Sequence, residues 1–338
     1  MNINQAIKAV ISKKDLNEGE MLDVMNSIMT GQTTDAQIGA FLIGLSMKGE
    51  TIEEITASAK VMRSLATSVE LSSTEYLVDT CGTGGDGLGL FNISTASAFV
   101  VAAAGGKVAK HGNRSISSKS GSADVLEAAG INLNLSPEVI SECIEKIGVG
   151  FMFAPAHHSA MKHAIGPRKE LAVRTIFNVL GPLTNPAKAP NQVIGVYDRN
   201  LVEPIANVLK SLKSRHVMVV HSADGLDEFS VADKTFVAEL YNDEVSTYSV
   251  HPDDFGLKLG NLNDIKAENA DESLSLIYEA FSGHNGTAKN IIALNAGAAI
   301  YVSGLEDTLS SGIAKASKVL SDGSAKEKLE EYIFASNN

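Results

Sequence analysis

The sequence predicts an α/β protein with a small N-terminal helical domain and a larger α/β domain, whose largely parallel central sheet is flanked by helices. Three observations predict this fold class. Residues 1 to about 68 carry helix-capping spacings, short apolar runs alternate with helical patterns after residue 76, and a glycine-rich loop follows the first of those runs. A chain of 338 residues is also long enough for about two domains.

The first part of the chain reads as a bundle of short helices. Three pairs of residues have the spacing of a capping box: Asn17 with Glu20, Thr34 with Gln37, and Thr51 with Glu54. After the first pair, five apolar residues recur on one helical face: Met21, Val24, Met25, Ile28 and Met29. Gly31 and Gly49 stand where helix C-caps belong. The methionine-rich face is expected to be core or subunit interface.

Strands and helices alternate in the second part. The short apolar runs are EYLVDT, KVAKHG, VGFMFAP, QVIGVYD and HVMVVHS, and helical patterns such as SPEVISECIEKIG separate them. One segment, GPRKELAVRTIFNVLGPLTNP, interrupts the alternation with the pattern of an amphipathic helix. We expect it to rejoin the N-terminal bundle, so that residues 1–68 and about 160–187 form one domain and residues 69–159 and 188–338 the other. AKNIIALNAGAAIYVSG fits a buried helix or a buried strand equally well.

Composition excludes several function classes. The net charge of −12 and the pI near 5.2 argue against a nucleic-acid-binding protein, because phosphate backbones require a basic surface. Two cysteines cannot form a disulfide framework and fit a reducing compartment. The N-terminal segment lacks the pattern of a signal peptide, and no apolar run reaches the length of a membrane span. We therefore expect a cytoplasmic protein without membrane partners.

The stretch DTCGTGGDGLGLFNIST places five glycines within eight residues, between a predicted strand and a predicted helix. Bare backbone N–H groups at the start of a helix favour an anion, most often a phosphate. The P-loop pattern fails because no Lys-Ser or Lys-Thr follows the glycines. The dinucleotide pattern matches by letter at Gly82, Gly84 and Gly87, but the acidic ribose-binding residue is missing from the following segment. A dinucleotide site is therefore disfavoured.

A basic cluster follows the loop. Five cationic or titratable residues fall within 13 positions of an acidic chain, with serines between them: Lys107, Lys110, His111, Arg114 and Lys119. This pattern favours a multiply charged anion over a solvated basic loop. Ser122, in SGSADVLEAAG, is expected to be a helix N-cap and a further anion-receptive position.

Two adjacent acids, Asp227 and Glu228, follow the apolar run HVMVVHS and a glycine turn. Carboxylates at such a place can hold Mg²⁺ together with substrate phosphates. Taken alone, the pair fits a turn with two solvated acids better. The metal-binding interpretation gains support only when it is joined to the phosphate site.

With these pieces together, the chain resembles the anthranilate phosphoribosyltransferase family. The matching motifs run in family order from about residue 76 to 304: GTGGDG, FNIST, KHGNRS, GSADVLEAAGI, FAPAHHSAMKHAIGPRKELAVRTIFNVLGPLTNP, HSADGLDE and NAGAAIYVSG. The resemblance implies transfer of the 5-phosphoribosyl group from 5-phosphoribosyl 1-diphosphate to anthranilate in tryptophan biosynthesis. The products would be N-(5-phosphoribosyl)anthranilate and diphosphate. It also implies Mg²⁺ as cofactor and a homodimer formed through the helical domain.

The resemblance further implies the site residues. The donor, 5-phosphoribosyl 1-diphosphate, would contact Gly82, Gly85, Asp86, Leu90, Asn92, Ile93, Ser94, Thr95, Lys110, His111, Gly112, Asn113, Arg114, Ser115, Ser118 and Ser122. Anthranilate would contact Gly82, Asn113 and Arg168, with His111 and His158 as neighbours. The metal ligands would be Ser94, Asp227 and Glu228. One departure is visible, because Leu90 stands where many members carry Thr and offers no hydroxyl.

No residue is expected to act as a covalent nucleophile, since the reaction needs none. Cys81 is expected to be a small buried hydrophobe. His157, His158 and His163 are spaced like ligands on one helix, but we prefer surface or supporting roles to a zinc site. Arg168 either grips the anthranilate carboxylate or forms an ion pair with a neighbour such as Glu170.

Two other functions stay open from the sequence. A pyrimidine-nucleoside phosphorylase would share the architecture but use phosphate and a nucleoside. A non-catalytic relative that binds nucleic acid would need an extended basic surface, which the net charge disfavours.

Overall fold

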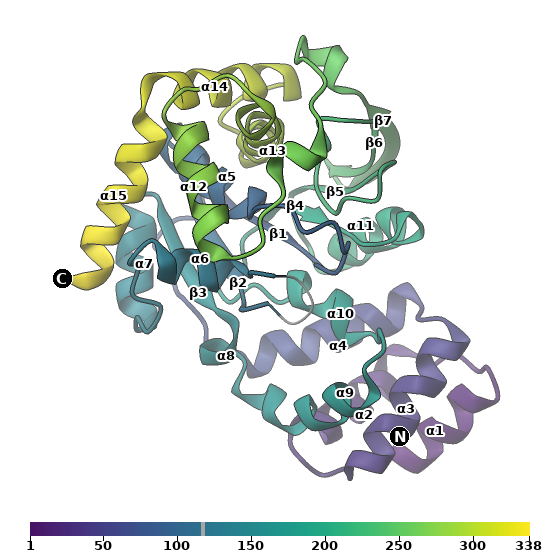
Figure 1. The fold of residues 1–338 in the computed structure, drawn as a ribbon. Helices are drawn as coiled ribbons and strands as arrows, with labels where there is room; N and C mark the ends of the chain where they lie inside the picture. The colour runs from purple at the N-terminus through teal and green to yellow at the C-terminus, as the bar shows by residue number, and fades with distance from the viewer. Residues whose placement is uncertain (116–118) are drawn as a thin grey trace.

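The computed structural model describes residues 1–115 and 119–338 (Figure 1). An N-terminal helical bundle lies beside a larger α/β unit, as the sequence predicts. The bundle consists of α1 (Ile3–Ile11), α2 (Glu18–Met29), α3 (Asp35–Lys48) and α4 (Ile52–Leu65). The three predicted capping boxes are present, and a fourth, unpredicted one joins Asn2 to Gln5. The methionine-rich face of α2 is buried in the core, with none of its five residues more than 3% exposed.

Seven strands form one sheet in the order β3-β2-β1-β4-β5-β6-β7. They are β1 (Leu77–Gly82), β2 (Lys107–Gly112), β3 (Val149–Phe153), β4 (Asn191–Gly195), β5 (His216–Ser222), β6 (Thr235–Tyr241) and β7 (Glu244–Val250). The first five in chain order pair in parallel, and each matches one of the predicted apolar runs. The β6–β7 hairpin is antiparallel and was not predicted. Its turn, Asn242–Asp243, has φ values of 51° and 62°, the positive values that a tight hairpin turn requires.

Helices cover both faces of the sheet (Figure 1). One face packs against a continuous apolar cluster from α5 (Ile93–Ala103), α6 (Ser122–Ala128), α12 (Ala270–Phe281), α13 (Thr287–Ser303), α14 (Leu309–Asp322) and α15 (Ser324–Asn337). The other face packs against α7 (Pro137–Lys146), α11 (Val202–Ser211) and bundle residues. The segment AKNIIALNAGAAIYVSG, left open between helix and strand, is the buried helix α13.

Residues 154–183 form five short elements, and the last three of them fall on the segment GPRKELAVRTIFNVLGPLTNP, for which the sequence pattern predicted one amphipathic helix. They are α8 (Ala154–His157), η1 (Ser159–His163), α9 (Ile165–Leu171), α10 (Phe177–Leu180) and η2 (Gly181–Leu183). The single-helix prediction is wrong because Ala172 has a left-handed φ of 51°, which ends α9. Elements of this return segment, residues 154–183, pack on the bundle: η1 on α2 and α9 on α3. The exact domain boundaries stay a prediction.

Three further 3₁₀ turns complete the described structure: η3 (Arg199–Leu201), η4 (Pro252–Phe255) and η5 (Leu262–Ile265). Within the described ranges, none of the helices combines the length and the apolar character that a bilayer crossing requires.

Candidate active site

The predicted site residues gather at the carboxyl ends of the parallel strands. Strand β1 is joined through α5 to β2 on one side, whereas β4 pairs with β1 on the other. Gly82 at the end of β1 therefore lies opposite Gly195 at the end of β4. Open α/β sheets bind ligands at this kind of switch point, where neighbouring connections run in opposite directions. The topology places the glycine loop there.

The backbone of the glycine loop, residues 82–89, is hydrogen-bonded to the backbone of β4 and to a side chain of the β5–β6 connection. Gly84, Gly85, Gly87 and Gly89 all have φ between 67° and 83°, a region that other residues rarely adopt. The N–H of Thr83 donates to the Gly195 carbonyl at 2.9 Å. The N–H of Gly84 donates to Asp227 Oδ2 at 2.8 Å. The glycines thus allow a conformation that brings the loop onto an acidic group.

Asp227 and Glu228 lie directly behind this loop. Asp227 is 8% exposed, so it is not the solvated turn residue that the pair alone suggested. Burial, and then the charge of Asp86, raises the pKa of Asp227 to about 7. Burial, and then the charge of Asp227, raises the pKa of Glu228 to about 8. These raised pKa values show that the site favours a proton or a bound cation over two uncompensated carboxylates.

Asp86 lies near this pair within the glycine loop. Its Oδ1 accepts a hydrogen bond from the N–H of Leu88 at 3.2 Å, and its charge contributes to the raised pKa values of both Asp227 and Glu228. Ser94, the predicted third metal ligand, hydrogen-bonds the Glu228 carboxylate. The structure therefore brings the three predicted metal ligands and Asp86 to one place.

Lys110 lies in β2, beneath the site, and is only 3% exposed. Its Nζ donates to the Thr80 carbonyl at 2.6 Å and to Ser94 Oγ at 3.3 Å. Burial lowers the pKa of Lys110, and the neighbouring charge of Asp79 opposes that shift. The Lys110 amino group is thus buried between the start of α5 and the acids.

Asp79 was not predicted to belong to the site. It is fully buried in β1, where it accepts hydrogen bonds from Asn185 Nδ2 at 2.8 Å and from the N–H of His111 at 3.2 Å. These contacts join β1 to β2 and to the chain just after η2. The sequence signal that could have indicated it is an acid within an apolar run directly before a glycine loop.

The start of α5 carries the next predicted donor contacts. Asn92 is fixed on both sides: its Oδ1 accepts from Ser273 Oγ at 2.8 Å and from Ser120 Oγ at 3.1 Å. Ile93 is buried in the core, so only its backbone can reach a ligand. The Thr95 hydroxyl is buried without a hydrogen-bond partner among the described residues. Ser273, on α12, is a supporting residue that sequence reasoning missed.

Leu90, the departure from the family pattern, is half-buried and forms a backbone bridge with Lys266. Its contribution is therefore packing and backbone, as expected from the missing hydroxyl.

The predicted basic cluster is less open than its sequence suggests. The Arg114 guanidinium contacts Glu127 at 2.8 Å and Asp124 at 2.9 Å, and these acids raise its pKa. Lys119 forms an ion pair with Glu268. Arg114 and Lys119 are thus paired with carboxylates.

The neighbouring loop positions are close together. Asn113 is exposed, and its carbonyl accepts from Ser122 Oγ at 3.2 Å. Ser115 donates its N–H to Asp124 Oδ2 at 3.1 Å. A Cβ on Gly112 would lie 2.2 Å from Ser122 Oγ, so only glycine fits there. The N-cap of α6 is Gly121, and the prediction for Ser122 is wrong by one position because Asp124 bonds the Gly121 N–H. Ser118 lies outside the described residues.

The predicted acceptor contacts come from β1, from β2 and the loop after it, and from the return segment, which carries His158 and Arg168. His111 and His158 are both buried, with ring centroids 5.1 Å apart. Burial and neighbouring histidines lower the pKa of His111 to about 3 and that of His158 to about 4. Both rings are therefore neutral near pH 7, and the described residues leave each Nε2 without a partner. Two unpartnered buried nitrogens suit hydrogen bonds to a bound molecule.

Arg168 lies on α9, with its guanidinium 5.2 Å from the centroid of the Phe177 ring. Burial lowers its pKa. The described residues show no ion pair between Arg168 and Glu170, so the alternative role considered for this arginine has no support. The guanidinium remains available to a carboxylate ligand.

His157, His158 and His163 do not share one helix, because α8 ends at His157 and η1 follows. His157 bonds the Thr67 carbonyl at 2.8 Å, and His163 lies against Gly31. No group of three or more His, Cys, Asp or Glu side chains in residues 1–115 and 119–338 is arranged to hold a metal by itself. Cys81 is 7% exposed, and burial raises the pKa of its thiol well above the ordinary value, as expected for an inert residue.

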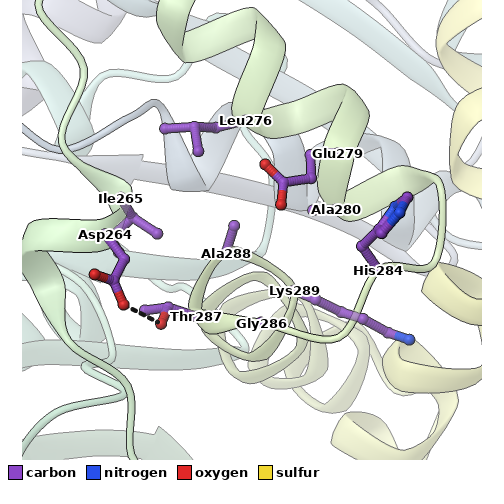
Figure 2. A pocket seen from close by; sticks show the side chains of 10 residues that line it. All are labelled: Asp264, Ile265, Leu276, Glu279, Ala280, His284, Gly286, Thr287, Ala288 and Lys289. Carbon is purple, nitrogen blue, oxygen red and sulfur yellow. Dashed lines mark hydrogen bonds between the residues drawn. The ribbon is translucent and has the colours of Figure 1, made fainter.

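A cavity of about 250 Å³ lies between α12, η5 and the start of α13 (Figure 2). Its walls carry both signs of charge, from Asp264, Glu279 and Lys289. A second cavity of about 430 Å³ lies between α3 and α9. Neither is lined by a predicted site residue.

Comparison with known proteins gives the same assignment throughout the chain. Residues 74–326 match the model of the glycosyl transferase family, a/b domain, and residues 4–66 match that of its helical bundle domain. The anthranilate phosphoribosyltransferase of Ruthia magnifica is 69% identical, over all of both chains. That of a Marinomonas species is 62% identical, over 98% of this chain and 96% of the relative.

Solved structures agree. Anthranilate phosphoribosyltransferase from Thermus thermophilus matches with a TM-score of 0.93 at 40% identity, covering 98% of this chain and 99% of that one. The enzyme from Saccharomyces cerevisiae, solved in complex with PRPP and Mg, matches with a TM-score of 0.90 at 26% identity, covering 99% and 98%. The expected fold and family are confirmed, and the chain belongs to the anthranilate phosphoribosyltransferases of the glycosyl transferase family.

Proposed function

We infer that this protein transfers the 5-phosphoribosyl group from 5-phosphoribosyl 1-diphosphate to anthranilate, releasing diphosphate, as a step of tryptophan biosynthesis. The relatives are named for this activity. The observation that carries the inference is the hydrogen bond from Gly84 N–H to Asp227 at the switch point of the sheet. This bond joins the glycine loop, the expected diphosphate site, to Asp227, an expected metal ligand. The diphosphate and the metal would therefore bind side by side in one site.

Mg²⁺ fits the residues present. Asp227 and Glu228 repel each other in a buried place, which a divalent cation would relieve, and Ser94 adds a hydroxyl oxygen. Because the residues that the structure describes supply few ligands, the remaining ones would come from water and donor oxygens, which is how Mg²⁺ is usually bound. When bound, the metal would stabilise negative charge on the departing diphosphate. Asp86 would reach the metal or its waters.

The protein's own groups act by position and charge. Some loop N–H groups, such as those of Thr83, Gly84 and Leu88, are bonded within the protein. The other loop N–H groups and the buried Lys110 would stabilise charge on the leaving group as it develops. Asn92, Thr95 and the residues 110–115, with Ser122, would surround the phosphoribosyl part. Anthranilate is a neutral amine, so it needs to be held in line with the anomeric carbon more than activated. No covalent enzyme intermediate is required.

The acceptor would lie against the return segment. Arg168 would bind the anthranilate carboxylate, since a guanidinium can donate two parallel hydrogen bonds to it. Asn113, Gly82 and the neutral His111 and His158 would surround the ring. The return segment would thus hold the acceptor beside the donor.

We propose that two copies associate through the helical domain, residues 1–68 with about 160–187. Ile11 and Met47, on α1 and α3, are 67% and 79% exposed although both are apolar. A cytoplasmic location remains the expectation from the cysteine content.

A fluorescence assay tests the function. Purified protein with anthranilate, donor and Mg²⁺ should consume anthranilate, and omission of donor or Mg²⁺ should stop it. The chain has no Trp, which lowers the background signal. Release of free base from thymidine or uridine with phosphate, without anthranilate consumption, would instead identify a nucleoside phosphorylase.

A further inference from the structure

Arg174 connects the return segment to the glycine loop. It lies between α9 and α10, just after the left-handed Ala172 turns the chain. One guanidinium nitrogen donates to the carbonyl oxygen of Gly85 at 2.5 Å. Residues 174 and 85 are thus joined although they are far apart in sequence, and Arg174 is absent from the predicted site residues.

The guanidinium is itself held in place. It lies 3.9 Å from the centroid of the Tyr197 ring, in the geometry of a cation–π contact. The N–H of Tyr197 in turn donates to Thr83 Oγ1 at 3.0 Å. Two contacts therefore hold the glycine loop. The Tyr197 backbone, just after β4, holds it at Thr83, and Arg174, which stacks on the Tyr197 ring, holds it at Gly85.

This contact decides the orientation of one peptide group. In a planar trans peptide the C=O and the following N–H point in opposite directions. Because Arg174 holds the Gly85 carbonyl, the N–H of Asp86 must point away from Arg174. Gly84 and Gly85, with φ of 67° and 83°, have the freedom to let this peptide rotate when nothing holds it.

We propose that Arg174 is a positioning residue, which fixes the Gly85–Asp86 peptide so that its N–H is set in advance for the donor diphosphate. Arg174 acts through the loop and does not itself touch the reacting atoms. The proposal rests on the donor site described under the proposed function. Loss of the contact lets the peptide sample other orientations, and this costs donor affinity.

The test compares Arg174→Ala with Arg199→Ala. The Arg199 guanidinium also stacks on an aromatic ring, 3.7 Å from the Phe236 centroid, but no hydrogen bond to the glycine loop is recorded for it in the described structure. Arg174→Ala should raise the donor KM by about 10-fold, the effect of one hydrogen bond from a charged donor, with the anthranilate KM and kcat changed less than about 2-fold. Arg199→Ala should leave all three parameters as in wild type.

Two further variants separate positioning from general structure. Tyr197→Leu removes the ring and keeps the backbone N–H, so it should raise the donor KM in the same direction by a smaller factor. Arg174→Lys keeps the charge but cannot stack and donate in one plane, so it should recover only part of the affinity. Thermal unfolding midpoints of the two Arg174 variants should stay within about 2 °C of wild type, since a change at an exposed residue rarely alters stability by more than about 0.5 kcal/mol. Tyr197 packs against the apolar core, so a lower midpoint for Tyr197→Leu alone reports lost packing.

An unchanged donor KM in Arg174→Ala, or an equal loss in both KM values and kcat, would overturn the proposal. Calorimetric titration with donor and Mg²⁺ tests the role of Arg174 in donor binding independently of whether the protein catalyses the proposed reaction. If wild type binds the donor but makes no product, the proposed function fails, and the ratio of donor Kd values between Arg174→Ala and wild type still decides the role of Arg174.

Discussion

A methyl group on Gly195 would lie 1.5 Å from the carbonyl oxygen of Asp227. The end of β4 and the backbone of the acidic connection are therefore in direct contact, and no larger residue fits. Gly82, the cross-strand partner of Gly195, meets the same acid, since its added Cβ would lie 2.7 Å from Asp227 Oδ2. Two facing glycines thus set the position of the carboxylate.

Gly195→Ala should displace Asp227 and lower kcat/KM by about 100-fold, the loss that a shift of about 1 Å in a catalytic constellation produces. Steady-state kinetics at saturating Mg²⁺ measures it. Gly19→Ala is the matched control, because Gly19 is an exposed helix residue whose added Cβ meets nothing closer than 3.5 Å. An active Gly195→Ala protein would show that the acid's position is not critical.

Asp227→Asn should raise the Mg²⁺ concentration for half-maximal activity by more than about 10-fold, since even outer contacts of metal sites change affinity by this much. Glu228→Gln should act in the same direction. A Mg²⁺ titration of the initial rate checks both. Asp233→Asn, an exposed acid of the same connection, should titrate like wild type. Unaltered Mg²⁺ dependence in all three variants would remove the metal assignment.

His158 should make the protein less stable in acid. Its pKa in the folded protein is about 4, below the ordinary 6.5, so the unfolded chain binds a proton first as the pH falls. The contribution of His158 to the free energy of unfolding is present above about pH 6.5. It is lost as the pH falls toward 4, by on the order of 2 kcal/mol at pH 4.5. His158→Gln should reduce the fall of the thermal unfolding midpoint between pH 7 and 4.5 without abolishing it, because the pKa of His111 is also lowered, to about 3. His284→Gln, at an exposed position, should keep the wild-type slope; equal slopes in all three proteins contradict the prediction.

Ser273→Ala should weaken donor binding from a distance. The Ser273 hydroxyl both donates to Asn92 Oδ1 and accepts from the Asn92 N–H, at 2.8 and 3.0 Å. Its removal leaves partly buried groups unpaired, which costs about 1–3 kcal/mol. Calorimetry should show a weaker donor Kd with an unchanged anthranilate KM. Ser275→Ala, on an exposed turn of the same helix, is the comparison, and an identical donor Kd in both variants would count against the role of Ser273.

Arg168→Ala should raise the anthranilate KM by about 10- to 100-fold, because the carboxylate loses hydrogen bonds from a charged donor. Lys169→Ala, its exposed neighbour, should have wild-type kinetics. Separate variation of the two substrates distinguishes the acceptor from the donor. A defect confined to the donor would place Arg168 elsewhere in the mechanism.

The parts of the fold that local sequence determines were predictable. The capping boxes after Asn17, Thr34 and Thr51 depend on residues three positions apart, and the glycine loop is written in eight consecutive residues. The hairpin turn Asn242–Asp243 could also have been found, since the flanking runs TFVAELY and EVSTYSV are strand-like.

Contacts between distant segments were not predictable. Asn92 and Ser273 are 181 positions apart, and Asp79 and Asn185 are 106 apart, so no local pattern records either hydrogen bond. From Gly166 onward the return segment has the pattern of an amphipathic helix, but its packing between bundle and sheet overrides that preference at Ala172. The family motifs identified the participating residues, whereas the structure adds which of them support one another.

The β6–β7 hairpin has a practical consequence for engineering. Strand β6 runs antiparallel to β5, so it starts near the acidic connection. It ends at the amino-terminal ends of the parallel strands, where Asn242 and Asp243 form an exposed tip. An affinity tag, a fluorophore or new chain termini introduced there would be separated from the substrates by the full height of the sheet.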